Sequence, residues 1–346
     1  MKKIIALLIS AAMLLTMVVG LTACGGSSAP ADNGGEQQPA GSEAAAPAGP
    51  SVGGTLSMGT GGDAGTYYAV GGVITTVLNS KTDLNVNYVS TGGSKDNLVS
   101  MQDGIYQMAT VQSDVMTYAY NGTNTFAESG AIDCFNVLCA LYAETVQIVT
   151  CDENLKSVAD LKGKSVCVGD VGSGTYYNTV DVLAAYGMTI DDINPVYQSF
   201  GDSTESLTDG KIDAAFLCAG APTPAVTQLA MSKPVYLISI DDEHMSKLLE
   251  ACPYYASYTI PERTYDVAPA ATTVTVKATL VGSKDLTEDQ AYAIVSTIFE
   301  NKEEIATLHA KGEELSVEFA TEGIAVPFAK GAAKYFAEKG ITVATD

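Results

Sequence analysis

The sequence contains few of the residues on which most enzymes and nucleic-acid-binding proteins depend. Arg263 is the only arginine among 346 residues, and His244 and His309 are the only histidines. With 40 acidic residues against 18 lysines and arginines, the formal net charge is −22. A chain this acidic repels nucleic acid and anionic lipid, and it does not attract an anionic ligand from a distance. Any anion that it binds must therefore be held by local dipoles.

Catalytic and metal-binding motifs are missing as well. No two cysteines have the C-x-x-C spacing of a zinc site, and the chain has neither a G-x-x-x-x-G-K-[ST] loop nor a G-x-S-x-G elbow. The stretch GTGGDA, residues 59–64, fits the loose dinucleotide pattern G-x-G-x-x-A. However, NYVSTGG follows at the next strand, where that pattern expects an acidic residue. We therefore predict a protein that is not an enzyme and has no cofactor or metal.

The amino-terminal residues predict export. Two lysines precede an apolar run at residues 4–19, and LTAC follows at residues 21–24, as in a signal peptide. LTAC also resembles a bacterial lipobox, which implies a lipid on Cys24 and anchoring to the outer face of the cell membrane. We expect a signal peptide over residues 1–23. Residues 24–51 are rich in Gly, Pro, Ala and Ser, which predicts a flexible linker.

Six cysteines follow Cys24, and they form two groups. Three lie within apolar, strand-like runs and are predicted to be buried thiols: Cys139, Cys167 and Cys218. An exported protein can also keep disulfides, which makes pairing an open alternative for the other three: Cys134, Cys151 and Cys252.

Strand-like and helix-like segments alternate along the remaining chain, and one sequence pattern occurs twice. GTYY occurs at residues 65–68 and again at 174–177, each time at the start of a predicted helix. Residues 88–104 (YVSTGGSKDNLVSMQDG) likewise parallel residues 197–210 (YQSFGDSTESLTDG). Matches in the same order predict an α/β fold with two βαβαβ-type lobes, parallel strands and helices on both faces.

Apolar segments between and after the two repeats predict how the lobes are joined. Residues 137–142 and 146–150 are interpreted as two strands that lead from the first unit to the second. The β-branched stretch 271–283 is interpreted as a strand that carries the chain back. Two crossings predict a two-strand hinge with a cleft between the lobes. We expect the first lobe to comprise residues 52–143 and 272–346, and the second residues 144–271.

Glycine-rich loops precede three predicted helices, at residues 59–66, 90–94 and 172–175. The first amides of a helix lack internal partners and carry partial positive charge, so such loops can hold a carboxylate without a cation. Plain tight turns and tyrosines that only pack are the alternatives, and Asp114 fits a helix N-cap equally well. The predicted ligand-binding residues are Gly62, Tyr67, Tyr68, Thr91, Gly92, Gly93, Ser94, Gln112, Ser113, Asp114, Ser173, Gly174, Thr175 and Gly220.

Several of these segments together resemble the TAXI-type solute-binding proteins of tripartite ATP-independent periplasmic (TRAP) transporters. The resemblance covers residues 54–341, and its motifs are GTGGDAGTYYAVGG, STGGSKDN, VQSDV, GSGTYYN and DGKIDAAF. It implies a two-lobed, type II periplasmic-binding-protein-like fold that closes over a small organic acid or amino acid, such as glutamate, glutamine or a dicarboxylate. It also implies delivery of that ligand to integral-membrane TRAP permease subunits.

The resemblance has one departure and leaves one alternative. The family commonly carries a Pro-Leu-His-Pro-Gly-Ala segment near the C-terminus, whereas PFAKGAAKYF, residues 327–336, lacks the histidine and the second proline. This departure puts the choice of permease in doubt. The alternative function is a ligand-sensing extracytoplasmic subunit that works with a membrane receptor.

Overall fold

The computed structural model describes residues 52–265 and 269–346. Cys24, the predicted signal peptide and the predicted linker lie outside the described residues. No helix in the described part of the chain is both long enough and apolar enough to span a bilayer.

The first repeat forms a βαβαβ unit, as predicted. It comprises β1 (Gly54–Gly59), α1 (Thr66–Lys81), β2 (Leu84–Val89), α2 (Ser94–Gln102) and β3 (Met108–Gln112). Both β2 and β3 pair with β1 in parallel, which gives the order β2-β1-β3. The helix α1 forms because its apolar side chains recur at helical spacing on one buried face: Val70, Ile74, Val77 and Leu78.

The second repeat has the same topology. Its elements are β5 (Ser165–Cys167), α4 (Thr175–Ala185), β6 (Asn194–Val196), α5 (Phe200–Thr208) and β7 (Ala214–Ala219). Parallel pairing of β5 with β6 and with β7 gives the order β6-β5-β7, which matches β2-β1-β3. The internal repeat therefore corresponds to two equivalent βαβαβ units, and α1 and α4 occupy equivalent positions.

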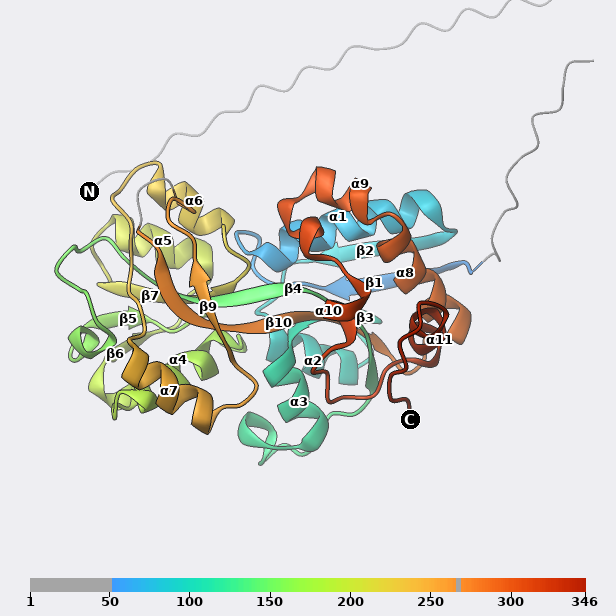
Figure 1. The fold of residues 1–346 in the computed structure, drawn as a ribbon, viewed down its shortest axis with the longest axis horizontal. Coiled ribbons are helices and arrows are strands. Elements are labelled where there is room, and N and C mark those ends of the chain that lie inside the picture. Colours follow the sequence, from blue (N-terminus) through green and yellow to red (C-terminus); the bar gives the residue numbers. More distant parts are fainter. Residues whose placement is uncertain (1–51, 266–268) are drawn as a thin grey trace, which may run out of the picture. The chain divides into compact units, whose positions relative to one another are not determined.

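Two long antiparallel strands join the units, β4 (Phe135–Thr150) and β10 (Ala271–Ser283). They run side by side from one unit to the other (Figure 1). The prediction of two strands within residues 137–150 is wrong, because Phe135–Thr150 form one continuous strand in which every residue but Ala143 is buried. The prediction that the strands are parallel is also incomplete. The strand β4 pairs antiparallel with β7, and β10 pairs antiparallel with β3.

The result is one mixed sheet of ten strands in the described chain. Its main order is β2-β1-β3-β10-β4-β7-β5-β6, with β8 (Tyr236–Leu237) on β4 and β9 (Ala256–Ile260) on β10. The returning strand β10 is inserted antiparallel between β3 and β4. The predicted fold class is therefore confirmed: α/β, with two lobes joined by two strands.

The remaining helices cover the sheet (Figure 1). They are α3 (Ser113–Asn121), α6 (Pro224–Ala230), α7 (Asp242–Ala251), α8 (Glu288–Glu300), α9 (Lys302–Leu308), α10 (Val317–Thr321) and α11 (Lys330–Glu338). Short 3₁₀ turns lie at residues 124–126, 158–161, 190–192 and 310–314. The carboxyl-terminal tail is mainly helical with breaks around Gly312, Gly323 and Pro327, as predicted.

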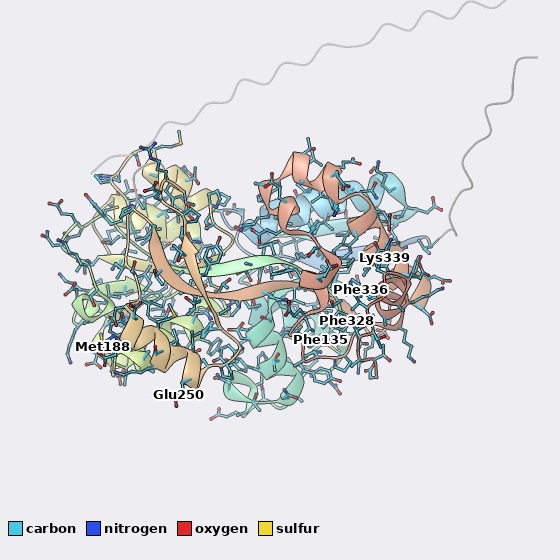
Figure 2. The ribbon with its side chains drawn as sticks, viewed as in Figure 1. Phe135, Met188, Glu250, Phe328, Phe336 and Lys339 are labelled. Atoms are coloured by element: carbon cyan, nitrogen blue, oxygen red, sulfur yellow. The ribbon has the colours of Figure 1, made fainter. Side chains whose placement is uncertain are left out.

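Each unit packs around its own core. The core of the first lobe draws on residues 52–142 and 278–336 and includes Phe135, Phe328 and Phe336, whose side chains lie near α11 in Figure 2. The second lobe has two clusters between residues 146 and 276, one of which includes Met188 (Figure 2). In β4 the core therefore changes from one lobe to the other between Tyr142 and Val146. The lobe boundaries given above stay a prediction.

Candidate functional site

A cavity lies at the carboxyl ends of β1, β3 and β7, where the two lobes meet. It measures about 490 Å³, including the solvent space at its mouth. The first lobe contributes the loops before α1 and α2, and the second contributes residues of the loops before α4 and α5. In α/β sheets ligands bind at such strand ends.

The cavity brings together eight of the fourteen predicted ligand-binding residues. They are Gly62, Tyr67, Thr91, Gly92, Gly93, Ser94, Gln112 and Ser173. The other six are outside the lining: Tyr68, Ser113, Asp114, Gly174, Thr175 and Gly220. Whether any of the fourteen contacts a ligand stays a prediction.

The amino-terminus of α1 is open toward the cavity. Gly65 precedes the helix in an extended conformation, and no side chain caps the first turn. The N–H of Gly65 itself donates to the carbonyl of Gly62 at 2.9 Å. The N–H groups of the first helical turn, which begins at Thr66, lack the main-chain partners that later turns have. They are thus suited to receive a carboxylate.

The amino-terminus of α2 has fewer open amides than the sequence predicts. Gly172 of the second lobe places its carbonyl oxygen 3.0 Å from the N–H of Lys95 and 3.4 Å from the N–H of Asp96. The N–H of Gly92 donates to Asp96 Oδ2 at 3.0 Å, and that of Gly93 donates to Thr91 Oγ1 at 3.2 Å. Hydrogen bonds within this loop, together with the contact to the second lobe, therefore occupy most of its donors.

The loop before α4 also serves contact between the lobes. Within the second lobe, Ser173 Oγ accepts from the N–H of Thr175 at 3.1 Å, and Thr175 Oγ1 accepts from the N–H of Cys218 at 3.4 Å. A side-chain carbon at Gly174 would lie 1.8 Å from Gln112 Oε1, so only glycine allows this approach. The predicted residues Gly174 and Thr175 thus act in packing in this structure.

A buried polar network connects the lobes beside the cavity. Gln112 Nε2 donates to Asn178 Oδ1 at 2.8 Å, and Asn178 Nδ2 donates to Asp114 Oδ2 at 3.1 Å. Burial raises the pKa of Asp114 to about 7; Asp181 adds to the rise, while hydrogen bonds from the Val115 N–H and from Asn178 oppose it. The N-cap interpretation of Asp114 is wrong, because α3 begins at Ser113 and its N-cap is Gln112.

Ser113, Tyr68 and Gly220 have other partners in the structure. Ser113 Oγ accepts from the N–H of Lys277 at 3.1 Å. The ring of Tyr68 packs on Tyr88 with 4.9 Å between centroids. Gly220 accepts a hydrogen bond at its carbonyl from Thr66 Oγ1 at 2.9 Å, which again joins the two lobes.

Glu144 is a lining residue that the sequence analysis did not single out. It lies on β4, is 1% exposed, and accepts a hydrogen bond at Oε2 from the hydroxyl of Tyr67 at 2.5 Å. Burial raises the pKa of Glu144 well above its usual range, although the Tyr67 hydroxyl and the charge of Lys311 oppose the rise. The signal was present as one acidic residue inside the apolar run NVLCALYAETVQIVT. Further lining residues not predicted are Gly61, Gly65, Thr66, Asp170, Ser199, Phe200, Cys218 and Ala219.

The lining, as far as the structure describes it, contains no lysine, arginine or histidine. Nor do the described residues include a group of three or more metal-ligating side chains. Cys139, Cys167 and Cys218 are buried thiols, as predicted. Cys134, Cys151 and Cys252 are also free, so the alternative of pairing among these three is not realised in the structure.

Comparisons with known proteins relate the chain to one protein family and to several solved structures. The model of the NMT1-like family matches residues 58–340. Among solved structures, a protein from Bordetella bronchiseptica RB50 is 17% identical with a TM-score of 0.51, over 82% of this chain and 88% of that one. At this identity the likeness shows a shared fold.

Two further similar structures have TM-scores of 0.47. One is the alkanesulfonate-binding protein SsuA from Xanthomonas axonopodis pv. citri bound to MOPS, 14% identical over 86% of this chain and 92% of that one. The other is the substrate-binding protein of an amino acid ABC transporter, 14% identical over 76% of this chain and all of that one.

Proposed function

The chain belongs to the NMT1-like family, and we propose that it is an extracytoplasmic solute-binding protein that captures a small organic acid or amino acid. The observation that carries this proposal is the cavity between the lobes, into which the uncapped first turn of α1 opens. A ligand carboxylate there gains several main-chain hydrogen bonds and the favourable end of the helix dipole. These local donors outweigh the distant negative charge of the chain, which salt screens within about 10 Å.

Capture in this proposal depends on closure of the two lobes around the ligand. The first lobe supplies the loops before α1 and α2, and the second supplies Ser173 and Ser199. The strands β4 and β10 are the covalent connections next to the cavity, and rotation about them opens it. The ligand stabilises the closed form because it contacts both lobes at once.

We further propose that the protein delivers its ligand to a TRAP-type secondary transporter. It rests on the TAXI-like motifs, several of which line the cavity: Gly61, Gly62 and Tyr67 in one, Thr91 to Ser94 in another, and Gln112 in a third. In this proposal a lipid on Cys24 holds the protein at the membrane, and the permease is driven by an ion gradient. Intact-mass analysis of the mature protein tests the anchor, because lipidation requires Cys24 as the first residue.

A direct experiment tests capture of a ligand. Small molecules released from freshly purified protein are identified by mass spectrometry and returned to the emptied protein in a thermal-shift assay. At a hundredfold excess over Kd, binding stabilises the native state by about 2.7 kcal/mol. If glutamate, glutamine, 2-oxoglutarate, C4-dicarboxylates and the released molecules all leave the melting temperature unchanged, the proposal is wrong.

Reconstitution tests the partner. Ligand uptake into vesicles that carry a TRAP permease should require this protein and an ion gradient, and it should proceed without ATP. Uptake that depends on ATP instead would assign the protein to another class of transporter.

A further inference from the structure

Glu144 is a buried carboxyl group on one of the two strands that join the lobes. It lies on β4 opposite Val276 of β10, at the point where both strands pass from one lobe to the other. Its side chain is buried and lines the cavity. Oε2 accepts from Tyr67, whereas Oε1 has no hydrogen-bond partner among the described residues. Oε1 is not among the buried side-chain atoms that lack a partner, so it is accessible from the cavity and free to contact a ligand.

No described cation neutralises this carboxyl group. Besides burial, which raises the pKa of Glu144 most, two charged groups act on it: Asp114 adds to the rise, and Lys311 opposes it. The Nζ of Lys311, however, pairs with Glu314 Oε1 at 2.5 Å. Glu144 itself forms no ion pair with a described residue. The empty site therefore favours the protonated form of Glu144, and a cation that entered the cavity would supply the missing counter-charge.

Tyr67 links this carboxyl to the carboxylate position proposed above. Its main chain belongs to the first turn of α1, and its hydroxyl contacts Glu144. The cavity thus offers main-chain N–H groups for a negative group at the first turn of α1, and a carboxyl group without a counter-ion at Glu144. A second ligand carboxylate could accept a hydrogen bond from Glu144 only while Glu144 stays protonated, whereas the ammonium group of a zwitterion pairs with the ionised form.

We propose that Glu144 binds a protonated amino group of the ligand, so that the site takes an amino acid in preference to a plain organic acid. This inference rests on the proposed function and narrows its ligand class. On binding, the Glu144 carboxyl transfers its proton to the buffer, and the resulting carboxylate pairs with the ligand ammonium. The Tyr67 hydroxyl remains the second partner of the carboxylate and holds its orientation.

Matched ligands and matched variants test this inference by isothermal titration calorimetry. The probes are the twenty L-amino acids and, for each that binds, the same acid without its amino group, for example L-glutamate against glutarate. The variants are Glu144→Gln, which keeps shape but cannot carry charge, and Glu250→Gln as control, at an exposed position on α7 (Figure 2). The melting temperature of each empty variant reports folding.

The expected result has three parts. Loss of the ligand amino group weakens binding by at least a hundredfold, and Glu144→Gln weakens binding of the amino acid to a similar degree while Glu250→Gln does not. Titration at pH 6 in phosphate and in Bis-Tris, whose ionisation enthalpies differ, shows release of up to one proton per ligand bound. Glu144→Gln abolishes that release.

Other results overturn the inference in ways that separate it from the proposed function. If an organic acid without an amino group binds as well as the amino acid, or if Glu144→Gln binds as the parent does, Glu144 does not recognise an amine. Should Glu144→Gln fail to fold, matched ligands together with proton release on the parent protein still decide. Absence of binding by every probe and by the molecules released on purification would instead remove the proposed function, and this inference with it.

Discussion

Because the carboxyl group of Asp114 is buried between the lobes, we predict that it makes the stability of the folded protein depend on pH. Burial raises its pKa from 3.8 to about 7, so ionisation is opposed in the folded protein but not in the unfolded chain. Its contribution to stability is therefore fully present below about pH 4 and is lost as the pH rises through 7. Asp114→Asn resembles the protonated carboxyl and can still accept the hydrogen bond from Asn178 Nδ2. The variant should lack this dependence on pH.

The magnitude follows from the size of the shift. A rise of about three pKa units corresponds to about 4 kcal/mol of folding free energy lost between low and high pH. Between pH 5 and pH 8 the loss from this one group is about 2–3 kcal/mol. The stability of Asp114→Asn relative to the parent should therefore increase by that amount between the two pH values.

Urea unfolding at pH 5 and pH 8 measures this difference, with melting temperatures as a second readout. The control is Asp103→Asn, at an exposed position after α2. The control should follow the parent protein at both pH values. If Asp114→Asn also follows the parent, then Asp114 is not the buried, neutral carboxyl described here, and the closed arrangement of the lobes around it is wrong.

Two further predictions concern glycine packing and the thiols. Gly174→Ala should weaken ligand binding at least tenfold, because the new methyl group would collide with Gln112 of the other lobe. The control Gly201→Ala introduces only ordinary van der Waals contacts, so it should bind the ligand normally in the same titration. Equal affinity of the two variants would show that the lobes do not close through this contact. Alkylation of the native protein followed by peptide mass spectrometry should label Cys134 and Cys151, which are partly exposed, well before the buried cysteines Cys139, Cys167, Cys218 and Cys252. Rapid labelling of Cys139 or Cys218 would contradict the packing of β4 or β7.

The fold could be predicted from the sequence because local patterns and the repeat agree. GTYY at the start of α1 and of α4 marks equivalent helices, and the alternation around both yields the matching orders β2-β1-β3 and β6-β5-β7. The direction of β10 could not be predicted, since a β-branched run such as residues 271–283 has the same pattern in either orientation. The segment Phe135–Thr150 forms the single strand β4 although Glu144 interrupts its apolar run, so the apolar pattern alone does not show that the strand is continuous.

The site could be predicted only in part, because sequence gives loops but not their contacts. Gly62 and Ser94, which belong to Gly-rich loops before helices, line the cavity. The partner of the α2 amides is the carbonyl of Gly172 in the other lobe, and such a pairing depends on closure. Glu144 enters the cavity from a crossing strand rather than from a loop, so no loop motif contains it.

The crystal structure of the protein with the small molecule released on purification tests the central claim most directly. We predict that a carboxylate of that molecule lies within hydrogen-bond distance of the N–H groups of the first turn of α1, with both lobes in contact with the ligand and no lysine or arginine side chain on the carboxylate. A ligand bound outside this cavity, or one whose carboxylate is held by a lysine such as Lys311, would contradict the account.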